Sequence, residues 1–288
     1  MLHILDDYPI RVFPKSEWPL GLSEIPTPPT QLHIRGTIPT EVKFLCVVGP
    51  RKYTEYGKMA CQKLISGLAG FPICIVSGLA YGMDSIAHKA AIESGLVTIA
   101  FPGSGLGENV IYPSAHIHLA QEILERGGAL VSEFDDAFGI QNWMFPQRNR
   151  LLAGIADAVL IIEAHEKSGT SITARLATDY NRELCVVPGS IFNDGSIGSN
   201  RMIRAGATVV TTSEDILEAL RFEPQQTELV FNNLSEEEKT LLKNIPEPTS
   251  VEELIHRTGM QINEINVLVT GLEIKNIVRV INGKICKK

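Results

Sequence analysis

Between Val42 and Val210, apolar runs long enough for one strand alternate with amphipathic stretches long enough for a helix. Strands that are apolar on both faces and separated by helices favour parallel pairing through right-handed crossovers. We therefore predict an α/β domain over residues 41–220 with a mostly parallel sheet covered on both faces. Such a sheet binds ligands at the carboxyl ends of its strands. The expected strands are Phe44–Val48, Ile73–Val76, Val97–Phe101, Ala129–Ser132, Ala158–Glu163, Glu183–Val187 and Ala207–Val210. The expected helices are Tyr56–Leu68, Ser85–Ser94, Ile117–Glu125, Arg148–Gly154 and Ser171–Asn181.

The segments that flank this domain differ from it in character. Residues 1–40 contain seven prolines, which predict an extended lead-in that packs on the core rather than a helical domain. Residues 221–234 have the polar composition of a linker. Residues 235–288 then predict a small C-terminal domain in the order of a winged helix. Its expected elements are helices at Ser235–Asn244, Ser250–Thr258 and Gln261–Lys275, then strands at Ile277–Ile281 and Lys284–Cys286 around a turn at Asn282-Gly283.

Charge and composition exclude several classes of protein. The net charge of −7 argues against a protein that coats duplex DNA indiscriminately, because that behaviour needs a broad basic surface. The amino terminus lacks a signal-peptide pattern and no apolar run is long enough for a membrane helix, so a cytoplasmic location without membrane attachment is expected. The five scattered cysteines are expected to be reduced core thiols, with no metal site and no cofactor.

Glycine-bearing turns follow three of the expected strands. Gly49-Pro50-Arg51 combines a close backbone approach with a guanidinium suited to a phosphate. The segment Ser77-Gly78-Leu79-Ala80-Tyr81-Gly82 offers two glycines and a hydroxyl, and Gly103-Ser104-Gly105-Leu106-Gly107 offers three glycines. A turn after a strand also tolerates glycine for purely structural reasons, so no single turn identifies a ligand site. Three such turns after successive parallel strands favour an anion-binding site at that edge of the sheet.

Two further segments carry cations. Arg148, Asn149 and Arg150 follow Trp143 and Phe145, whose rings are of the kind on which single-stranded bases stack. The alternative for this segment is a salt-bridged helix start packed on core aromatics. Lys167-Ser168-Gly169-Thr170 places a lysine, hydroxyls and a glycine at a helix amino terminus, although it lacks the spacing of a Walker A loop.

Catalytic arrangements are weak in this sequence. His88 follows Asp84 by one helical turn, so the two would be able to hydrogen-bond, but no nucleophile or second carboxylate accompanies them. We interpret His88 as a helix-positioning residue rather than a base. No Cys-x-x-Cys, His-Glu-x-x-His or Gly-x-Ser-x-Gly motif occurs. The residues therefore do not favour a metal-dependent or serine-hydrolase mechanism.

Taken together in order, these motifs resemble those of the DprA/Smf family. The resemblance is carried by Val48–Arg51, Ser77–His88, Tyr112-Pro113, Ser132-Glu133, Phe145–Arg150, Ser168–Thr170, Thr173-Ala174, Pro188-Gly189 and Gly198–Asn200. It implies an extended Rossmann-like fold, single-stranded DNA binding, and loading of the RecA recombinase onto DNA during natural transformation. It also implies a homodimer formed through the Rossmann-like domain, no catalytic residue and no enzymatic activity.

Carried onto this sequence, the resemblance implies one set of nucleic-acid contacts. They are Arg51, Ser77, Gly78, Gly82, Gly103, Arg148, Asn149, Arg150, Lys167, Ser168, Gly169 and Thr170. Pro50 stands where the family usually has a small hydroxyl residue, which removes one side-chain contact beside Arg51.

Two other functions stay open at this point. One is a nucleotide-processing enzyme of the phosphoribohydrolase type, although Pro102–Glu108 only approximates the motif of that class. The other is a nucleotide-sensing scaffold that does not bind DNA. The C-terminal segment 227–288 has eight Lys plus Arg and nine Asp plus Glu, a net of 8 − 9 = −1. Because DNA-reading domains are distinctly basic, we expect it to bind a partner or to regulate.

Overall fold

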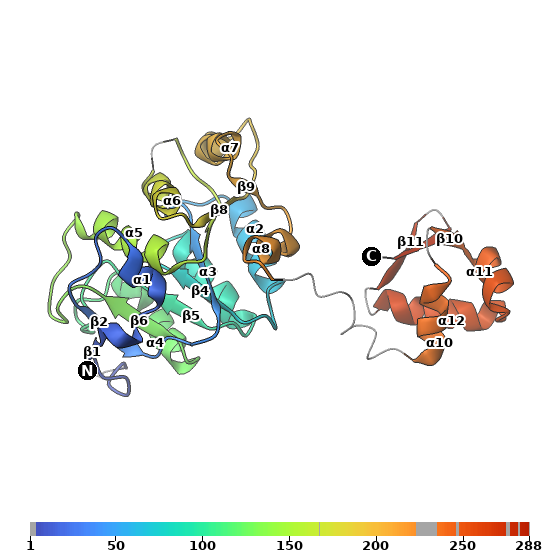
Figure 1. The fold of residues 1–288 in the computed structure, drawn as a ribbon, viewed down its shortest axis with the longest axis horizontal. Coiled ribbons are helices and arrows are strands. Elements are labelled where there is room, and N and C mark those ends of the chain that lie inside the picture. Colours follow the sequence, from blue (N-terminus) through green and yellow to red (C-terminus); the bar gives the residue numbers. More distant parts are fainter. Residues whose placement is uncertain are drawn as a thin grey trace. The chain divides into compact units, whose positions relative to one another are not determined.

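The computed structural model describes residues 4–166, 168–222, 235–245, 248–274, 277–281 and 283–287. The chain forms two compact units, Met1–Glu223 and Pro224–Lys288. Both units are drawn in Figure 1, and each is described by itself. Within the described residues, no helix has both the length and the apolar character needed to span a bilayer.

A nine-stranded sheet forms the centre of the larger unit, in the order β1-β2-β6-β5-β4-β3-β7-β8-β9. Its strands are β1 (Arg11–Phe13), β2 (Leu32–Gly36), β3 (Lys43–Val48), β4 (Ile73–Ser77), β5 (Thr98–Ala100), β6 (Ala129–Ser132), β7 (Ala158–Ile161), β8 (Glu183–Val186) and β9 (Thr208–Val209). The pairs from β6 through β9 are all parallel, in register such as Cys46 opposite Val76 and Val159. The predicted α/β class with a mostly parallel sheet is therefore confirmed.

The proline-rich lead-in contributes two strands that the sequence analysis did not foresee. β2 pairs with β6 and β1 pairs with β2, both antiparallel, so the lead-in closes one edge of the sheet. Trp18 and Leu22 of this segment are buried in the main core. The lead-in is thus an integral part of the larger unit.

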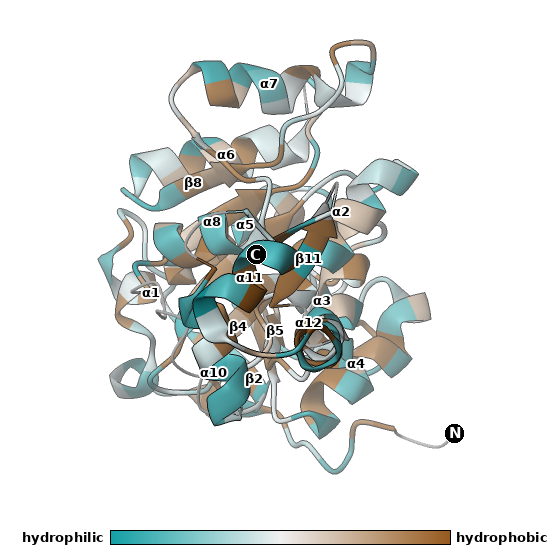
Figure 2. Cartoon of the chain, turned by 90° about the vertical axis from the view of Figure 1, so that its right-hand side faces the viewer, coloured by the Kyte–Doolittle hydropathy of each residue, from teal (hydrophilic) through white to brown (hydrophobic). Residues whose placement is uncertain are grey.

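Helices cover both faces of the sheet (Figure 1). They are α1 (Leu20–Glu24), α2 (Glu55–Ser66), α3 (Met83–Glu93), α4 (Ile117–Glu125), α5 (Met144–Ile155), α6 (Gly169–Asp179), α7 (Ile197–Arg204) and α8 (Ser213–Ala219). Because side chains alternate along a strand, β3 sends Leu45 and Val47 toward α2 and α3, and Cys46 and Val48 toward α5 and α6. Figure 2 shows the amphipathic character of the covering helices, with teal and brown parts side by side in α6 and α7.

The smaller unit consists of three helices and a three-stranded antiparallel sheet in the order β10-β12-β11. Its elements are α10 (Glu236–Lys243), β10 (Thr249–Ser250), α11 (Val251–Thr258), α12 (Ile262–Ile274), β11 (Val278–Ile281) and β12 (Lys284–Lys287). Capping boxes at Ser235/Glu238 and Ser250/Glu253 begin α10 and α11. The three helices and the two final strands are those that the sequence predicted, and β10 is an additional strand. Gly283 has the positive φ of +75° expected of the predicted hairpin turn, whereas Asn282 lies outside the described residues.

Candidate nucleic-acid interface

A cavity of about 480 Å³ opens at the carboxyl ends of β4, β3 and β7. From β3 the chain runs to β4, β5 and β6 on one side and then returns to β7, β8 and β9 on the other, so the strand order reverses beside β3. Open α/β sheets bind ligands at such a reversal. The cavity is lined by Val48, Gly49, Pro50, Arg51, Lys52, Ala80, Tyr81, Asp84, Phe145, Arg148, Asn149, Leu152, His165, Ser168, Gly169, Thr170 and Thr173.

Arg51 provides an exposed cation at the mouth of the cavity. Its guanidinium lies 5.0 Å from the centroid of the Phe145 ring, in cation–π contact. Gly49 has a packing role here, because a Cβ at this position would come 2.6 Å from Cγ of Met83. The position of Arg51 thus suits the predicted contact with a phosphate. Gly49 instead leaves room for the Met83 side chain of α3.

α2 is the helix that follows Arg51, and its amino terminus is not available to a phosphate. The hydroxyl of Thr54 accepts from the Gly57 backbone N–H (3.1 Å) and donates to Glu163 (2.5 Å). The Thr54 backbone N–H also donates to Glu163 at 3.0 Å. The buried Glu163 carboxylate therefore occupies this helix end.

A row of aromatic rings includes Phe145 and Tyr81 of the cavity lining. The ring centroids of Phe145 and Tyr112 are 5.8 Å apart, those of Tyr112 and Tyr81 are 6.2 Å apart, and those of Tyr81 and His116 are 5.0 Å apart. The Tyr81 side chain is exposed. Rings that are fixed by one another and partly open to solvent offer stacking surfaces to unpaired bases.

The amino terminus of α6 lines the opposite side of the cavity. Ser168 is its N-cap residue but makes no side-chain capping bond, and Gly169 is exposed. The first N–H groups of a helix without such a cap are suited to an anion. Ser168, Gly169 and Thr170 therefore lie where the sequence predicted them, and the predicted Lys167 lies outside the described residues.

Arg148 lies at the floor of the cavity and not on the surface. Its side chain is 6% exposed and donates through Nη1 to the Phe101 carbonyl. Burial lowers its pKa, opposed by the charge of Asp84. Burial likewise raises the pKa of Asp84, opposed by Arg148 and by a hydrogen bond from the Ala80 N–H at 3.3 Å. Both side chains lie against Gly78 of the β4–α3 loop.

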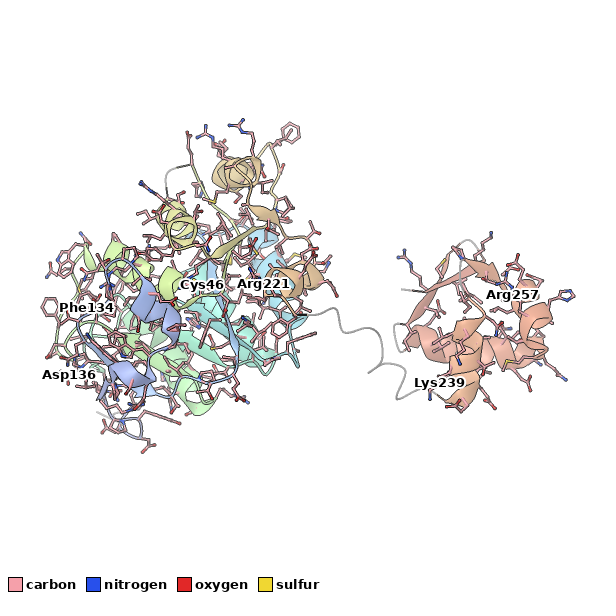
Figure 3. All side chains as sticks on the ribbon, in the orientation of Figure 1. Cys46, Phe134, Asp136, Arg221, Lys239 and Arg257 are labelled. Atoms are coloured by element: carbon pink, nitrogen blue, oxygen red, sulfur yellow. The ribbon has the colours of Figure 1, made fainter. Side chains whose placement is uncertain are left out.

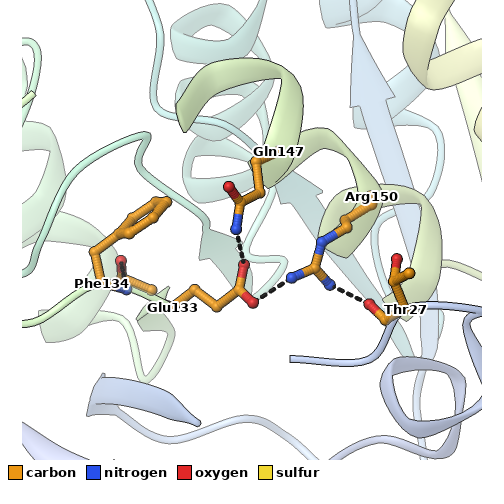
Figure 4. Close-up of polar contacts among 6 residues, drawn as sticks. Thr27, Glu133, Phe134, Gln147 and Arg150 are labelled. Atoms are coloured by element: carbon orange, nitrogen blue, oxygen red, sulfur yellow. Dashed lines mark hydrogen bonds and ion pairs between the residues drawn. The ribbon is translucent and has the colours of Figure 1, made fainter. Parts of the chain in front are cut away.

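Arg150 has a structural role, which corrects the nucleic-acid contact that the resemblance implied for it. It pairs with Glu133 and donates to the Thr27 carbonyl at 2.6 Å, while Gln147 donates to the same carboxylate at 3.3 Å (Figure 4). This network ties α5 to the lead-in and to the end of β6. The neighbouring Asn149 lines the cavity instead.

The Ser77–Gly82 loop is held mainly by packing, which corrects its predicted role as an anion cradle. Ser77 is fully buried and its hydroxyl donates to the Val47 carbonyl at 2.7 Å. A Cβ at Gly78 would overlap the Arg148 guanidinium, and a Cβ at Gly82, with φ of +83°, would overlap the Arg51 carbonyl. The glycines allow two loops to approach, and Tyr81 between them faces the cavity.

The glycines of the Gly103–Gly107 loop likewise make contacts within the protein. A Cβ at Gly103 would come 2.5 Å from the Phe145 ring. The N–H groups of Gly105 and Gly107 donate to the carbonyls of Phe138 (3.3 Å) and Asp136 (2.8 Å). Contact of this loop with phosphate is therefore not supported by the structure. Figure 3 labels Phe134 and Asp136 of the segment that the loop holds.

His88 is fully buried and does not line the cavity. Its Nδ1 hydrogen-bonds to the Thr98 hydroxyl at 2.7 Å rather than to Asp84, and burial lowers its pKa to about 3. Among the described residues no group of His, Cys, Asp or Glu would hold a metal ion. All five cysteines are thiols, four of them buried.

Sequence reasoning missed Lys52 and His165, which also line the cavity. Lys52 follows Arg51 directly, so its position in the same turn was the available signal. His165 follows β7 beyond a short loop, and no spacing rule would have singled it out.

Comparisons with known proteins agree with this arrangement. The family model of DNA recombination-mediator protein A matches residues 10–221. Protein Smf of Escherichia coli K12 is 37% identical over 266 residues, covering 88% of this chain and 71% of that protein. DNA processing protein DprA of Streptococcus pneumoniae R6 is 37% identical over 207 residues, covering 71% of this chain and 72% of that protein.

Two solved structures share the fold over most of the chain. The X-ray structure of DprA from Streptococcus pneumoniae has a TM-score of 0.68 and 34% identity, and covers 76% of each chain. A structure that describes the single-stranded DNA binding mode of DNA processing protein A from Helicobacter pylori has a TM-score of 0.65 and 29% identity, and covers 74% of this chain and 96% of that one. The chain therefore belongs to the DNA recombination-mediator protein A family.

Proposed function

We propose that this protein binds single-stranded DNA at the carboxyl edge of its sheet and loads the RecA recombinase onto that DNA during natural transformation. The observation that carries the proposal is the cavity at the β3/β7 reversal, which combines the exposed Arg51, a row of aromatic rings and the start of α6. These supply cations and amide donors for phosphates and stacking surfaces for bases. The single-stranded DNA binding mode described for the Helicobacter pylori relative supports the same ligand.

Electrostatics explain why an acidic chain would still bind a polyanion. The residues that line the cavity include three cations, Arg51, Lys52 and Arg148, and one carboxylate, Asp84, for a local balance of 3 − 1 = +2. The net charge of the whole chain is −7. Binding should therefore be confined to this edge and should weaken steeply with salt.

A titration of fluorescent oligonucleotides tests the proposal. Fluorescence anisotropy would compare a single strand with a duplex of the same sequence over a salt series. We expect the single strand to bind more tightly, with little dependence on base sequence. A protein that ignores single strands at low salt, or prefers the duplex, would contradict the proposal.

The protein is proposed to act without catalysis. His88 is buried and does not line the cavity, and Asp84 lies beside the positive charge of Arg148, so neither is placed as a base beside a nucleophile. Incubation with nucleoside monophosphates should release no free base. Release of base would favour the phosphoribohydrolase class instead.

RecA loading and self-association follow from the family resemblance and are proposals. Loading predicts that the protein shortens the lag of RecA ATP hydrolysis on single strands that already carry a single-strand-binding protein. Self-association through the Rossmann-like domain predicts a dimer mass for a chain that ends at residue 223. An unchanged lag would contradict RecA loading. A monomer at all concentrations would contradict self-association.

The C-terminal unit is proposed to contact a partner rather than duplex DNA. Its longest helix, α12, contains two glutamates and no lysine or arginine, which is unsuited to the major groove. Removing residues 224–288 should leave the affinity for single strands unchanged. A substantial loss would show that this unit is part of the DNA site.

A further inference from the structure

Helix α12 of the smaller unit carries apolar side chains beyond the face that packs in the core. Ile265, Val269 and Leu272 are buried in the core of that unit. Val267 lies outside that core and is 72% exposed, and Leu268 beside it is half-buried. Valine is a weaker helix former than lysine or glutamate, so helix stability does not explain an exposed valine at this position. Contact with another molecule does.

A groove of about 450 Å³ lies on this second face of α12. It is lined by Met260, Asn263, Glu264, Val267 and Leu268, and α10 contributes Glu237. The first five residues are spaced by three and four positions, so they share one side of the helix. Three of them are apolar, and a methionine side chain adapts its shape to a partner. The groove is therefore suited to apolar side chains from outside the chain.

The charge of this groove is negative. Glu237 and Glu264 are both exposed, and no lysine or arginine of the described residues lines the groove. Glu264 is held in place by accepting from the Gln261 backbone N–H at 2.9 Å. Glu236 is paired with Lys239 at 2.8 Å, whereas Glu237 has no ion pair within the part of the chain that the structure describes. Two carboxylates without a cation in the lining repel phosphates and attract a cationic partner.

The same charges disfavour a second copy of this chain as the occupant of the groove. In a symmetric contact each copy presents the same patch, so the carboxylates of one groove would lie near those of the other. A segment of another protein that combines cations with apolar side chains matches both features of the groove.

We propose that the groove binds a basic amphipathic helix of another protein, an inference that rests on the partner-binding role proposed for the C-terminal unit. A helix that docks in a groove presents apolar anchors at i, i+3 or i+4, and i+7. These anchors pack against Met260, Val267 and Leu268, and lysines or arginines beside them lie near Glu237 and Glu264. Exposed ion pairs add little affinity, but they select the partner and its orientation.

The test uses two fluorescent helical peptides as probes. One has leucines at the spacing i, i+3, i+4 and i+7 and lysines at the other positions, and the second has glutamate in place of every lysine. Fluorescence anisotropy measures the binding of each peptide to the full-length protein. We expect the lysine peptide to bind about tenfold more tightly, because the carboxylates attract one peptide and repel the other. Equal dissociation constants, or binding of neither peptide, would overturn the inference.

The variant Val267→Lys assigns the binding to the groove. Because Val267 is exposed and lysine is the better helix former, α12 should tolerate the change. The lysine peptide should bind this variant about tenfold more weakly, as expected for an apolar anchor near the centre of an interface. Val280→Lys is the matched control, because Val280 is 46% exposed in the same unit but does not line the groove. Val267→Leu keeps an apolar side chain and should bind like the wild type.

The outcomes separate the groove from the functions proposed above. Val267→Lys and the wild type should bind single-stranded DNA equally, so failure of the groove leaves DNA binding intact. Peptide binding that survives Val267→Lys but is lost on removal of residues 224–288 would overturn the groove and keep the partner-binding role of this unit. If Val267→Lys instead halves the molar mass in light scattering and leaves peptide binding unchanged, the face joins two copies of the chain and the inference is wrong.

Discussion

Replacing Gly78 with alanine tests how tightly the floor of the cavity is packed. An added Cβ would overlap the guanidinium of Arg148 and lie 2.5 Å from Oδ2 of Asp84. These two side chains are only 6% and 7% exposed, so neither can swing into solvent to make room. The alanine must therefore separate the two charges or displace the β4–α3 loop.

The expected cost follows from these contacts. Overpacking a buried site costs about 1–3 kcal/mol, and weakening the contact of two buried charges adds to it, so the free energy of unfolding of the larger unit should fall by ~2–4 kcal/mol. In a unit of this size each kcal/mol lowers Tm by roughly 2–4 °C. The Tm should thus fall by about 4–16 °C, and single-strand binding should weaken with it.

Intrinsic tryptophan fluorescence is the appropriate assay. The two tryptophans, Trp18 and Trp143, both lie in the larger unit, so thermal melts followed this way report that unit alone. Gly139→Ala is the matched control, because a Cβ there meets no atom within 4 Å. If Gly78→Ala melts at the same temperature as the wild type, the account of a tightly packed floor is wrong.

Three further predictions concern the cavity mouth, α2 and the core. Arg51→Ala should weaken single-strand binding about fivefold and flatten the salt slope by ~0.7, the value for one lost phosphate contact, whereas Arg126→Ala should match the wild type in the same anisotropy titration. If the salt dependence of binding is the same for Arg51→Ala as for the wild type, Arg51 does not contact the bound strand. Thr54→Ala removes the hydroxyl between Gly57 and Glu163 and should lower the free energy of urea unfolding by about 1–2 kcal/mol, and an unaltered midpoint would refute the capping role. Burial lowers the pKa of His88 from its ordinary 6.5 to about 3 in the folded protein. The unfolded state therefore binds more protons between these limits, and the free energy of unfolding of the wild type should fall as pH drops below 6.5, by up to ~1.4 kcal/mol per pH unit. His88→Asn keeps a donor toward Thr98 and should lose this component of the slope; equal slopes for the two proteins would contradict it.

The parallel part of the sheet was predictable because each of its central strands is apolar on both faces. The antiparallel lead-in was not. β1 has only three residues, of which two are exposed. β2 includes the buried Arg35, whose guanidinium donates hydrogen bonds to the carbonyls of Leu5, Tyr8 and Leu106. No local sequence pattern predicts strand and hydrogen-bond partners that lie so far away in the sequence.

The site was predictable in location but only partly in its contacts. A glycine that approaches a phosphate and one that makes room for a side chain look the same in a sequence, and Gly103 proved to face Phe145. Arg148 and Arg150 are two positions apart and therefore point about 200° apart around α5, which sends one to the cavity floor and the other to Glu133. Only the fold decides which arginine meets the ligand.

Photo-cross-linking locates the bound strand most directly. A single-stranded oligonucleotide with 5-iodouracil at successive positions would be irradiated with the full-length protein, and the modified peptides identified by mass spectrometry. We predict cross-links in the tryptic peptides 64–89 and 127–148, which carry Tyr81 and Phe145. Cross-links confined to residues 224–288, or to surfaces remote from the β3/β7 reversal, would contradict the assignment of single-stranded DNA to this edge of the sheet.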